Sequence, residues 1–321
     1  MINRDTKKQS REISIYLKNN TDESDYPIKL ISMKHIIFLF SILWMFTFGQ
    51  SSPLMAQSKT EEIVMMPRDK EIVETILKQL KTDQKLETGS LVIKVGQFFL
   101  GTPYVASTLE ISGTEKMVVN LRELDCTTFA ENCLALARTI KKENPTFNDF
   151  VDELRLIRYR DGILNGYPSR LHYFSDWIYN NDQKKLVKSL SKDIANIGID
   201  NRVNFMSTHP ESYPLLKNNP DFVKEIAIQE NAISNRKYWY IPKERLIEFE
   251  QQLHDGDILG ITTTIQGMDI SHVVIAIRKD GRIHLLHASL NFKKVLVSTE
   301  TLEQYLNAHK STTGIMVARP L

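Results

Sequence analysis

The stretch that decides the fold is residues 270–289, which read ISHVVIAIRKDGRIHLLHAS. Both halves are rich in β-branched and apolar residues, and the Asp-Gly pair at 280–281 between them is typical of a two-residue hairpin turn. The sequence therefore predicts two antiparallel strands joined by a tight turn.

The turn decides which face of the sheet each histidine occupies. With two turn residues, Val274 is opposite His287 and His272 is opposite Ser289, so both histidines lie on one face, one diagonal step apart. His284 points to the other face. A three-residue turn or a bulge would reverse this assignment, which leaves His284 as a rival partner for His272.

The only two cysteines of the chain, Cys126 and Cys133, are predicted to be free thiols. They lie two helical turns apart, about 10.5 Å, which exceeds the roughly 7 Å limit for a disulfide. Cys133 shares helical spacing with Phe129 and Ile140 and is expected in the core.

Cys126 is the candidate nucleophile because it follows Asp125, a favourable N-cap residue, at the start of this helix. The free N–H groups and positive partial charge of a helix start favour a thiolate and can bind an oxyanion. Such a thiol needs a base on a facing element, which His272 and His287 can supply.

The surrounding pattern indicates an α+β protein, with helices first and an antiparallel sheet later. We expect the cysteine helix to pack its N-terminus against the sheet face that carries both histidines. Helices are predicted at 71–81, 90–100, 126–142, 169–190, 243–253 and 299–308, and strands at 258–264, 270–278, 282–289, 293–298 and 313–319.

The N-terminal region has the pattern of an export signal. Residues 36–48 are 13 uncharged, mostly apolar residues after a basic start, too few for a membrane-spanning helix of about 20 residues. We expect 1–32 to be an upstream extension, 33–57 a cleaved signal peptide without a retained anchor, and 58–321 a single catalytic domain with a large, mostly helical insertion at about 143–237. The protein is therefore expected to be periplasmic or secreted.

Composition excludes several classes of protein. The 321 residues are 42% hydrophobic and 25% charged, which excludes a disordered chain or a disulfide-dense miniprotein. Seven of the 41 basic and five of the 39 acidic residues lie before residue 58, which leaves 34 of each. A balanced charge does not favour a nucleic-acid partner, and the Cys and His residues lack zinc-ligand spacing, so neither metal nor cofactor is expected.

Five short motifs occur in a familiar order. They are Leu100-Gly101-Thr102-Pro103-Tyr104, Asp125-Cys126-Thr127-Thr128-Phe129, Gly256-Asp257-Ile258-Leu259, Ser271-His272-Val273 and His287-Ala288-Ser289. This set resembles the signature of the NlpC/p60 superfamily of papain-like cell-wall cysteine hydrolases, in particular its divergent branch described as N-acetylmuramoyl-L-alanine amidase-like.

The resemblance implies a papain-like fold and assigns roles to single residues. Cys126 would be the nucleophile, His272 the general base and His287 the residue that orients the imidazole, with Tyr104 beside the thiol. Thr102 and Ser271, which belong to the same motifs, are candidate substrate-binding residues. The chain departs from the pattern after Tyr104, where the usual tryptophan and glycines are missing, and at 127–128, where Thr-Thr replaces Ser-Gly.

The long insertion carries further candidates for substrate binding. Residues 145–180 are rich in arginine and aromatic residues, and the predicted helix would present Arg170, Tyr173 and Trp177 on a face separate from its core positions, next to His172. Such a face suits a sugar–peptide ligand with carboxylates, although for any single residue a solvated face with aromatics that pack a subdomain is the simpler explanation. Residues 203–207 with His209 form a second candidate wall.

Taken together, these features predict a cysteine amidase that cleaves the bond between N-acetylmuramic acid and L-alanine in peptidoglycan or muropeptides. One alternative is an endopeptidase that cuts γ-D-glutamyl–diamino acid bonds in the stem peptide, with the same chemistry and a different pocket shape. Another is a non-catalytic cell-wall-binding module on the same fold. The sequence leaves the oligomeric state open.

Overall fold

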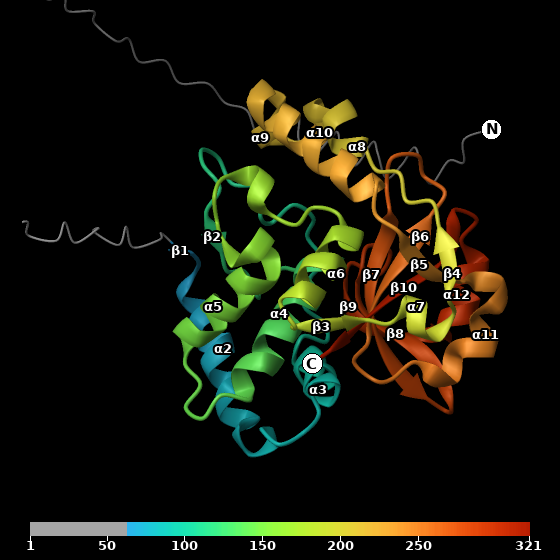
Figure 1. Cartoon of the computed structure of the whole chain (residues 1–321). Coiled ribbons are helices and arrows are strands. Elements are labelled where there is room, and N and C mark those ends of the chain that lie inside the picture. The colour runs from blue at the N-terminus through green and yellow to red at the C-terminus, as the bar shows by residue number, and fades with distance from the viewer. Residues whose placement is uncertain (1–62) are drawn as a thin grey trace, which may run out of the picture. The chain divides into compact units, whose positions relative to one another are not determined.

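A computed structural model describes residues 63–321, and an antiparallel sheet organises this part of the chain (Figure 1). The predicted extension and signal peptide lie outside the described residues, which belong to one compact unit. None of the helices within 63–321 has the length and apolar composition needed to cross a bilayer.

The main sheet has eight strands, and its neighbours follow the order β4-β5-β10-β6-β7-β8-β9, with β3 paired to β10. Their bounds are β3 Val187–Ser189, β4 Ile197–Ile199, β5 Tyr238–Pro242, β6 Ile258–Thr263, β7 Ile270–Lys279, β8 Arg282–Ser289, β9 Lys294–Thr301 and β10 Thr312–Pro320. A separate parallel pair joins β1 Ile63–Val64 to β2 Met117–Val118. The predicted α+β class is confirmed.

The predicted hairpin register is also confirmed. Lys279 pairs with Arg282 and Ile277 pairs with His284, which leaves only Asp280 and Gly281 in the turn. Both turn residues have positive φ, 52° and 79°, as a tight turn between twisted strands requires.

Six longer α-helices and five shorter ones accompany the sheet within residues 63–321. The longer helices are α2 Pro67–Gln79, α3 Thr88–Phe98, α4 Cys126–Ile140, α5 Phe147–Arg158, α6 Phe174–Gln183 and α10 Pro220–Ser234. The shorter ones are α7 Ser191–Ile194, α8 Phe205–Thr208, α9 Pro214–Lys217, α11 Leu246–Phe249 and α12 Leu302–Ala308.

Helix α4 is almost entirely buried and packs on the sheet, as predicted, but on the other face. Its apolar residues share a core with Val273, Ile275 and Leu286. Strand alternation therefore turns His272 and His287 towards the opposite core, which includes α12 (Figure 1). The expectation that α4 covers the histidine face is wrong, because the strands place the Val/Ile side, not the histidine side, under this helix.

The predicted helix over 169–190 is too long. Residues 167–169 form a 3₁₀ turn that contains Pro168, α6 then covers only Phe174–Gln183, and Val187–Ser189 pairs with β10. Lys185, at φ 58°, takes the left-handed conformation that ends the helix. Between 243 and 253 the predicted helix is divided into α11 and two flanking 3₁₀ turns.

Candidate active site

Cys126 is the first residue of α4 and is held there by a well-formed cap. The Asp125 carboxylate accepts hydrogen bonds from the Thr128 N–H and hydroxyl, both at 2.8 Å, and the Thr128 hydroxyl lies 2.9 Å from the Asp125 N–H. These bonds occupy the Thr128 N–H and leave the first N–H groups of the helix directed at the space beside the thiol. Both cysteines are free, and Cys133 is fully buried, as predicted.

The two histidines form a hydrogen-bonded pair, as the register predicted. His272 Nε2 lies 2.7 Å from His287 Nδ1, so one ring donates and the other accepts. His272 Nδ1 is then the ring nitrogen left for the thiol. His284 lies on the opposite face, where its Nδ1 donates to the Ser298 carbonyl at 3.1 Å, and the geometry therefore favours His287 over His284 as the partner of His272.

Two tyrosines lie around this pair and the thiol. The ring of Tyr305 on α12 stacks against His272 at 6.2 Å and meets His287 edge-on at 6.3 Å. Burial raises the pKa of Tyr305, and the charge of Cys126 adds to the rise. Tyr104 behaves likewise, with burial first and then Cys126 and Asp125 raising its pKa, which places its hydroxyl near the thiol as the resemblance implied.

Burial shifts the pKa values of the thiol and the imidazole in the directions that favour their neutral forms. Burial raises the pKa of Cys126 to about 11, with a further contribution from Asp125, while hydrogen bonds from Val273 and Thr127 oppose the rise. Burial, followed by repulsion from His287 and His309, lowers the pKa of His272 to about 3. The direction of both shifts favours a neutral thiol over the thiolate expected from the helix start, because burial and the capping carboxylate oppose ionisation of the sulfur.

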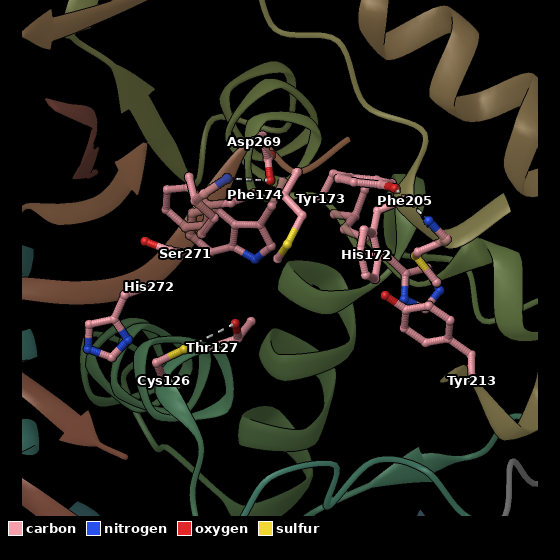
Figure 2. A pocket seen from close by; sticks show the side chains of 15 residues that line it. Cys126, Thr127, His172, Tyr173, Phe174, Phe205, Tyr213, Asp269, Ser271 and His272 are labelled. Atoms are coloured by element: carbon pink, nitrogen blue, oxygen red, sulfur yellow. Dashed lines mark hydrogen bonds between the residues drawn. The ribbon is translucent and has the colours of Figure 1, made fainter. Parts of the chain in front are cut away.

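A pocket of about 790 Å³, its open mouth included, begins at the thiol and extends away along the insertion (Figure 2). Its lining comprises Cys126, Thr127, Leu171, His172, Tyr173, Phe174, Trp177, Phe205, Met206, Tyr213, Met268, Asp269, Ile270, Ser271 and His272. The size is in the range of ordinary ligand pockets, and the walls are mainly aromatic and apolar. Figure 2 shows Cys126 and His272 together at one end, and His172 and Tyr213 at the other.

Four of the predicted binding residues line this pocket. They are Ser271, His172, Tyr173 and Trp177. The His172 ring packs at a tilt against Tyr167, with 4.4 Å between the ring centroids, and burial holds the pKa of His172 well below the usual range, which favours a neutral imidazole. The Tyr173 hydroxyl donates to Glu230 at 2.6 Å and accepts from the Met206 N–H, so it fixes the insertion against the pocket.

Two predicted residues are placed elsewhere. Arg170 is only 5% exposed and forms an ion pair with Glu110 at 2.5 Å, so it stabilises the interior instead of facing the pocket. Thr102 does not line the pocket; its carbonyl accepts a hydrogen bond from Val295 at 2.8 Å.

Several wall residues carry little sequence signal. Met268 and Asp269 precede β7, and Tyr213 lies in the insertion between short helical turns. Phe205 and Met206 belong to the predicted second wall over 203–207, which therefore does reach the pocket. Tyr305 could have been noticed only as an aromatic residue in the helix predicted at 299–308.

The arrangement provides a nucleophile, an oriented base and hydrogen-bond donors around one point, which is what acyl transfer from an amide requires. Among residues 63–321, no cluster of three or more His, Cys, Asp or Glu side chains could hold a metal ion.

The chain falls in the class of amide hydrolases by its similarity to known proteins. It belongs to the AmiA-like family, described as N-acetylmuramoyl-L-alanine amidase-like, whose model matches residues 94–315. It is similar to the crystal structure of an N-acetylmuramoyl-L-alanine amidase from Bacteroides uniformis, with 37% identity and a TM-score of 0.70 over 73% of this chain and 99% of that one.

Two other solved structures are similar. One, named a putative xylanase from Bacteroides fragilis, is 43% identical with a TM-score of 0.67 and covers 70% of this chain and 98% of its own. A protein from Legionella pneumophila, 20% identical with a TM-score of 0.57 over 78% and 95% of the two chains, shares the fold. The comparison with curated proteins gave no match.

Proposed function

We propose that this protein is an exported cysteine amidase that cleaves the amide between N-acetylmuramic acid and L-alanine in peptidoglycan or its fragments. The observation that carries the proposal is the His272–His287 bond of 2.7 Å beside a thiol at a capped helix start, at the end of an aromatic pocket. The family and the amidase from Bacteroides uniformis support the bond assignment. A papain-like fold of the NlpC/p60 type is part of the proposal.

In the first half-reaction, the Cys126 proton moves to His272 Nδ1 as sulfur attacks the lactyl carbonyl carbon. The Cys126 backbone N–H and the Tyr104 hydroxyl stabilise the oxyanion. The proton on His272 then passes to the alanine nitrogen, the C–N bond breaks, and a thioester remains on Cys126.

In the second half-reaction, His272 takes a proton from water, which attacks the thioester and releases the sugar acid and the thiol. His287 holds the imidazole in the orientation that presents Nδ1 to sulfur and stabilises its transient positive charge. A neutral resting pair suits this scheme, because the proton transfer and the attack then occur in one step.

Xylan hydrolysis, the activity in the name of one similar structure, is not favoured by this pocket. Glycosidases in general use two carboxylic acids that flank the bond. Asp269 is the single acidic residue in the lining, and its oxygens accept hydrogen bonds from the Ser175 and Ile270 N–H groups at 2.7 and 2.8 Å.

The test is mass spectrometry of defined muropeptides incubated with the protein, with Cys126→Ala and with Cys133→Ala. Free glycan and intact stem peptide should appear with the protein and with Cys133→Ala, and not with Cys126→Ala. Cleavage within the peptide would replace the amidase by the endopeptidase. If muropeptides bind but no product forms, the protein is a binding module and the proposal is wrong.

A further inference from the structure

The pocket has no positively charged side chain to pair with the carboxylates of the expected substrate. A muropeptide joins an uncharged sugar to a stem peptide that carries carboxylates. The lining of the pocket contains no lysine or arginine, and its only acidic residue is Asp269. Its aromatic walls suit the apolar face of a sugar ring, but they offer a carboxylate no cation.

A second surface lies across the thiol from the pocket. Strands β7, β8 and β9 are consecutive and antiparallel, so the β6–β7 loop and the turn at 290–293 leave the sheet at the same end. Met268 and Asp269 of that loop line the pocket, whereas the turn lies beyond β8 on the far side of His272. A chain that crosses the thiol from the pocket would therefore reach this turn.

The turn is attached to the loop that carries Tyr104. The Tyr104 N–H donates to the Lys293 carbonyl at 2.9 Å. Two more backbone hydrogen bonds join the segments: the Gly101 N–H donates to the Val295 carbonyl at 2.9 Å, and the Val295 N–H donates to the Thr102 carbonyl at 2.8 Å. Lys293 has φ 57°, an uncommon conformation for lysine that these bonds fix in place. The backbone of the turn is thus held in a fixed position against the loop that carries Tyr104.

Those side chains are complementary to an acidic peptide. Lys293 and Lys294 are exposed, and within residues 63–321 neither ammonium group forms an ion pair. Phe292 beside them is 63% exposed, and its N–H is bonded to the Ser289 hydroxyl at 3.3 Å. Two unpaired cations and an aromatic side chain can bind carboxylates and the aliphatic parts of a peptide.

We propose that residues 290–294 form a second subsite that binds the carboxylates of the stem peptide, while the pocket takes the uncharged sugar. This inference rests on the proposed amidase function. It assigns a direction to the substrate, with the acyl side in the pocket and the leaving amine over the turn.

The test is a charge reversal, Lys293→Glu with Lys294→Glu. The substrates are N-acetylmuramoyl-L-alanyl-D-glutamate and the same compound with its glutamate carboxylates amidated. The reversal should raise KM for the acidic substrate about 10-fold, since two attractive surface contacts become repulsive. KM for the amidated substrate, and kcat for both, should stay unchanged.

The control carries the same change of charge at the opposite end of the sheet. It is Lys85→Glu with Lys279→Glu: Lys279 ends β7, and Lys85 precedes α3, whose Gly89 packs against Asp255 at that end. Equal KM changes in the reversal and control variants, or equal changes for both substrates, would overturn the subsite.

A binding measurement separates this inference from the proposed function. Calorimetry with Cys126→Ala and the free acidic peptide L-alanyl-D-glutamate should show binding that the charge reversal weakens and the control does not. If the protein cleaves neither substrate, the amidase proposal fails, and the calorimetry alone decides the subsite. Binding that is insensitive to the reversal sinks the subsite even where cleavage occurs.

Discussion

The chemistry at the residue scale depends on burial. A thiol at a helix start is expected to ionise easily, yet Cys126 has a pKa of about 11 and His272 one of about 3. The cause is that both groups lose water on one side while a carboxylate, Asp125, lies behind the sulfur. Substrate must therefore trigger proton transfer, and the free protein should protect its thiol from oxidants.

We predict slow alkylation of Cys126 by iodoacetamide at pH 7, with a rate that rises towards an alkaline midpoint. With a neutral pair, kcat/KM should also stay level across neutral pH, because neither group titrates there. The measurement is the alkylation rate between pH 5 and 11, followed by mass spectrometry. Cys133 is an internal control, because it is 0% exposed and should react only after unfolding. An acidic midpoint would show a thiolate–imidazolium pair instead.

Substitution of His287 and of His284, the two candidates for the residue that orients His272, should have clearly different effects. His287→Ala removes the partner of His272 Nε2 and should lower kcat about 100-fold with little change in KM. His284→Ala should leave kcat near that of the unchanged protein but cost about 1–3 kcal/mol of unfolding free energy, because the buried Ser298 carbonyl loses its donor. Kinetics and urea unfolding of both variants give the answer, and a reversed pattern would make His284 the orienting residue.

At the scale of the element, the start of α4 combines two functions in one side chain. The Asp125 carboxylate caps the helix through the Thr128 N–H and also raises the pKa of the neighbouring thiol. These functions can be divided, since an amide oxygen can cap as well as a carboxylate but carries no charge.

We therefore predict that Asp125→Asn lowers the pKa of Cys126 and nearly preserves stability. Asp125→Ala should lower the same pKa and also cost about 1 kcal/mol of unfolding free energy through the lost cap. The alkylation midpoint reports the pKa, and thermal unfolding reports the cap. An unchanged midpoint in Asp125→Asn would mean that the carboxylate does not act on the thiol.

The sequence predicted features that depend on local interactions better than features that depend on contacts between residues far apart in the chain. The 280–281 turn and the Asp125 cap are local, and both were predicted correctly together with the free thiols. The insertion was predicted to be mostly helical, but the bounds of α5 and α10 were not, because the charged and aromatic residues there obscured the helical spacing. Arg170 was assigned to a ligand face, whereas its partner Glu110 lies 60 positions away, a contact that no local pattern reveals.

At the scale of the whole molecule, the sequence could not predict which face of the sheet α4 covers. Alternation along β7 shows only that His272 and Val273 point to opposite sides; which side receives α4 depends on packing across the entire sheet. The pocket could not be predicted for the same reason, because its walls come from β7 and from α6 and other parts of the insertion, which are far apart in the chain.

Burying two neutral imidazoles under α12 should make the stability of the whole molecule depend on pH. In the unfolded chain each histidine takes up a proton below about pH 6.5, whereas in the folded protein His272 and His287 do so only near 3 and 4. Since the unfolded state binds more protons in this window, the unfolding free energy falls as pH falls from 6.5 towards 4. Each histidine contributes up to about 1.4 kcal/mol per pH unit.

Urea unfolding at pH 7.5, 6, 5 and 4 measures this dependence, and the double variant His272→Gln with His287→Gln isolates it. The variant should lose less stability on acidification than the unchanged protein, because glutamine takes up no proton in either state. Carboxylates contribute equally to both proteins and cancel in the difference. Parallel losses would mean that the folded protein already protonates the histidine pair at mildly acidic pH, and the neutral-pair mechanism would then fail as well.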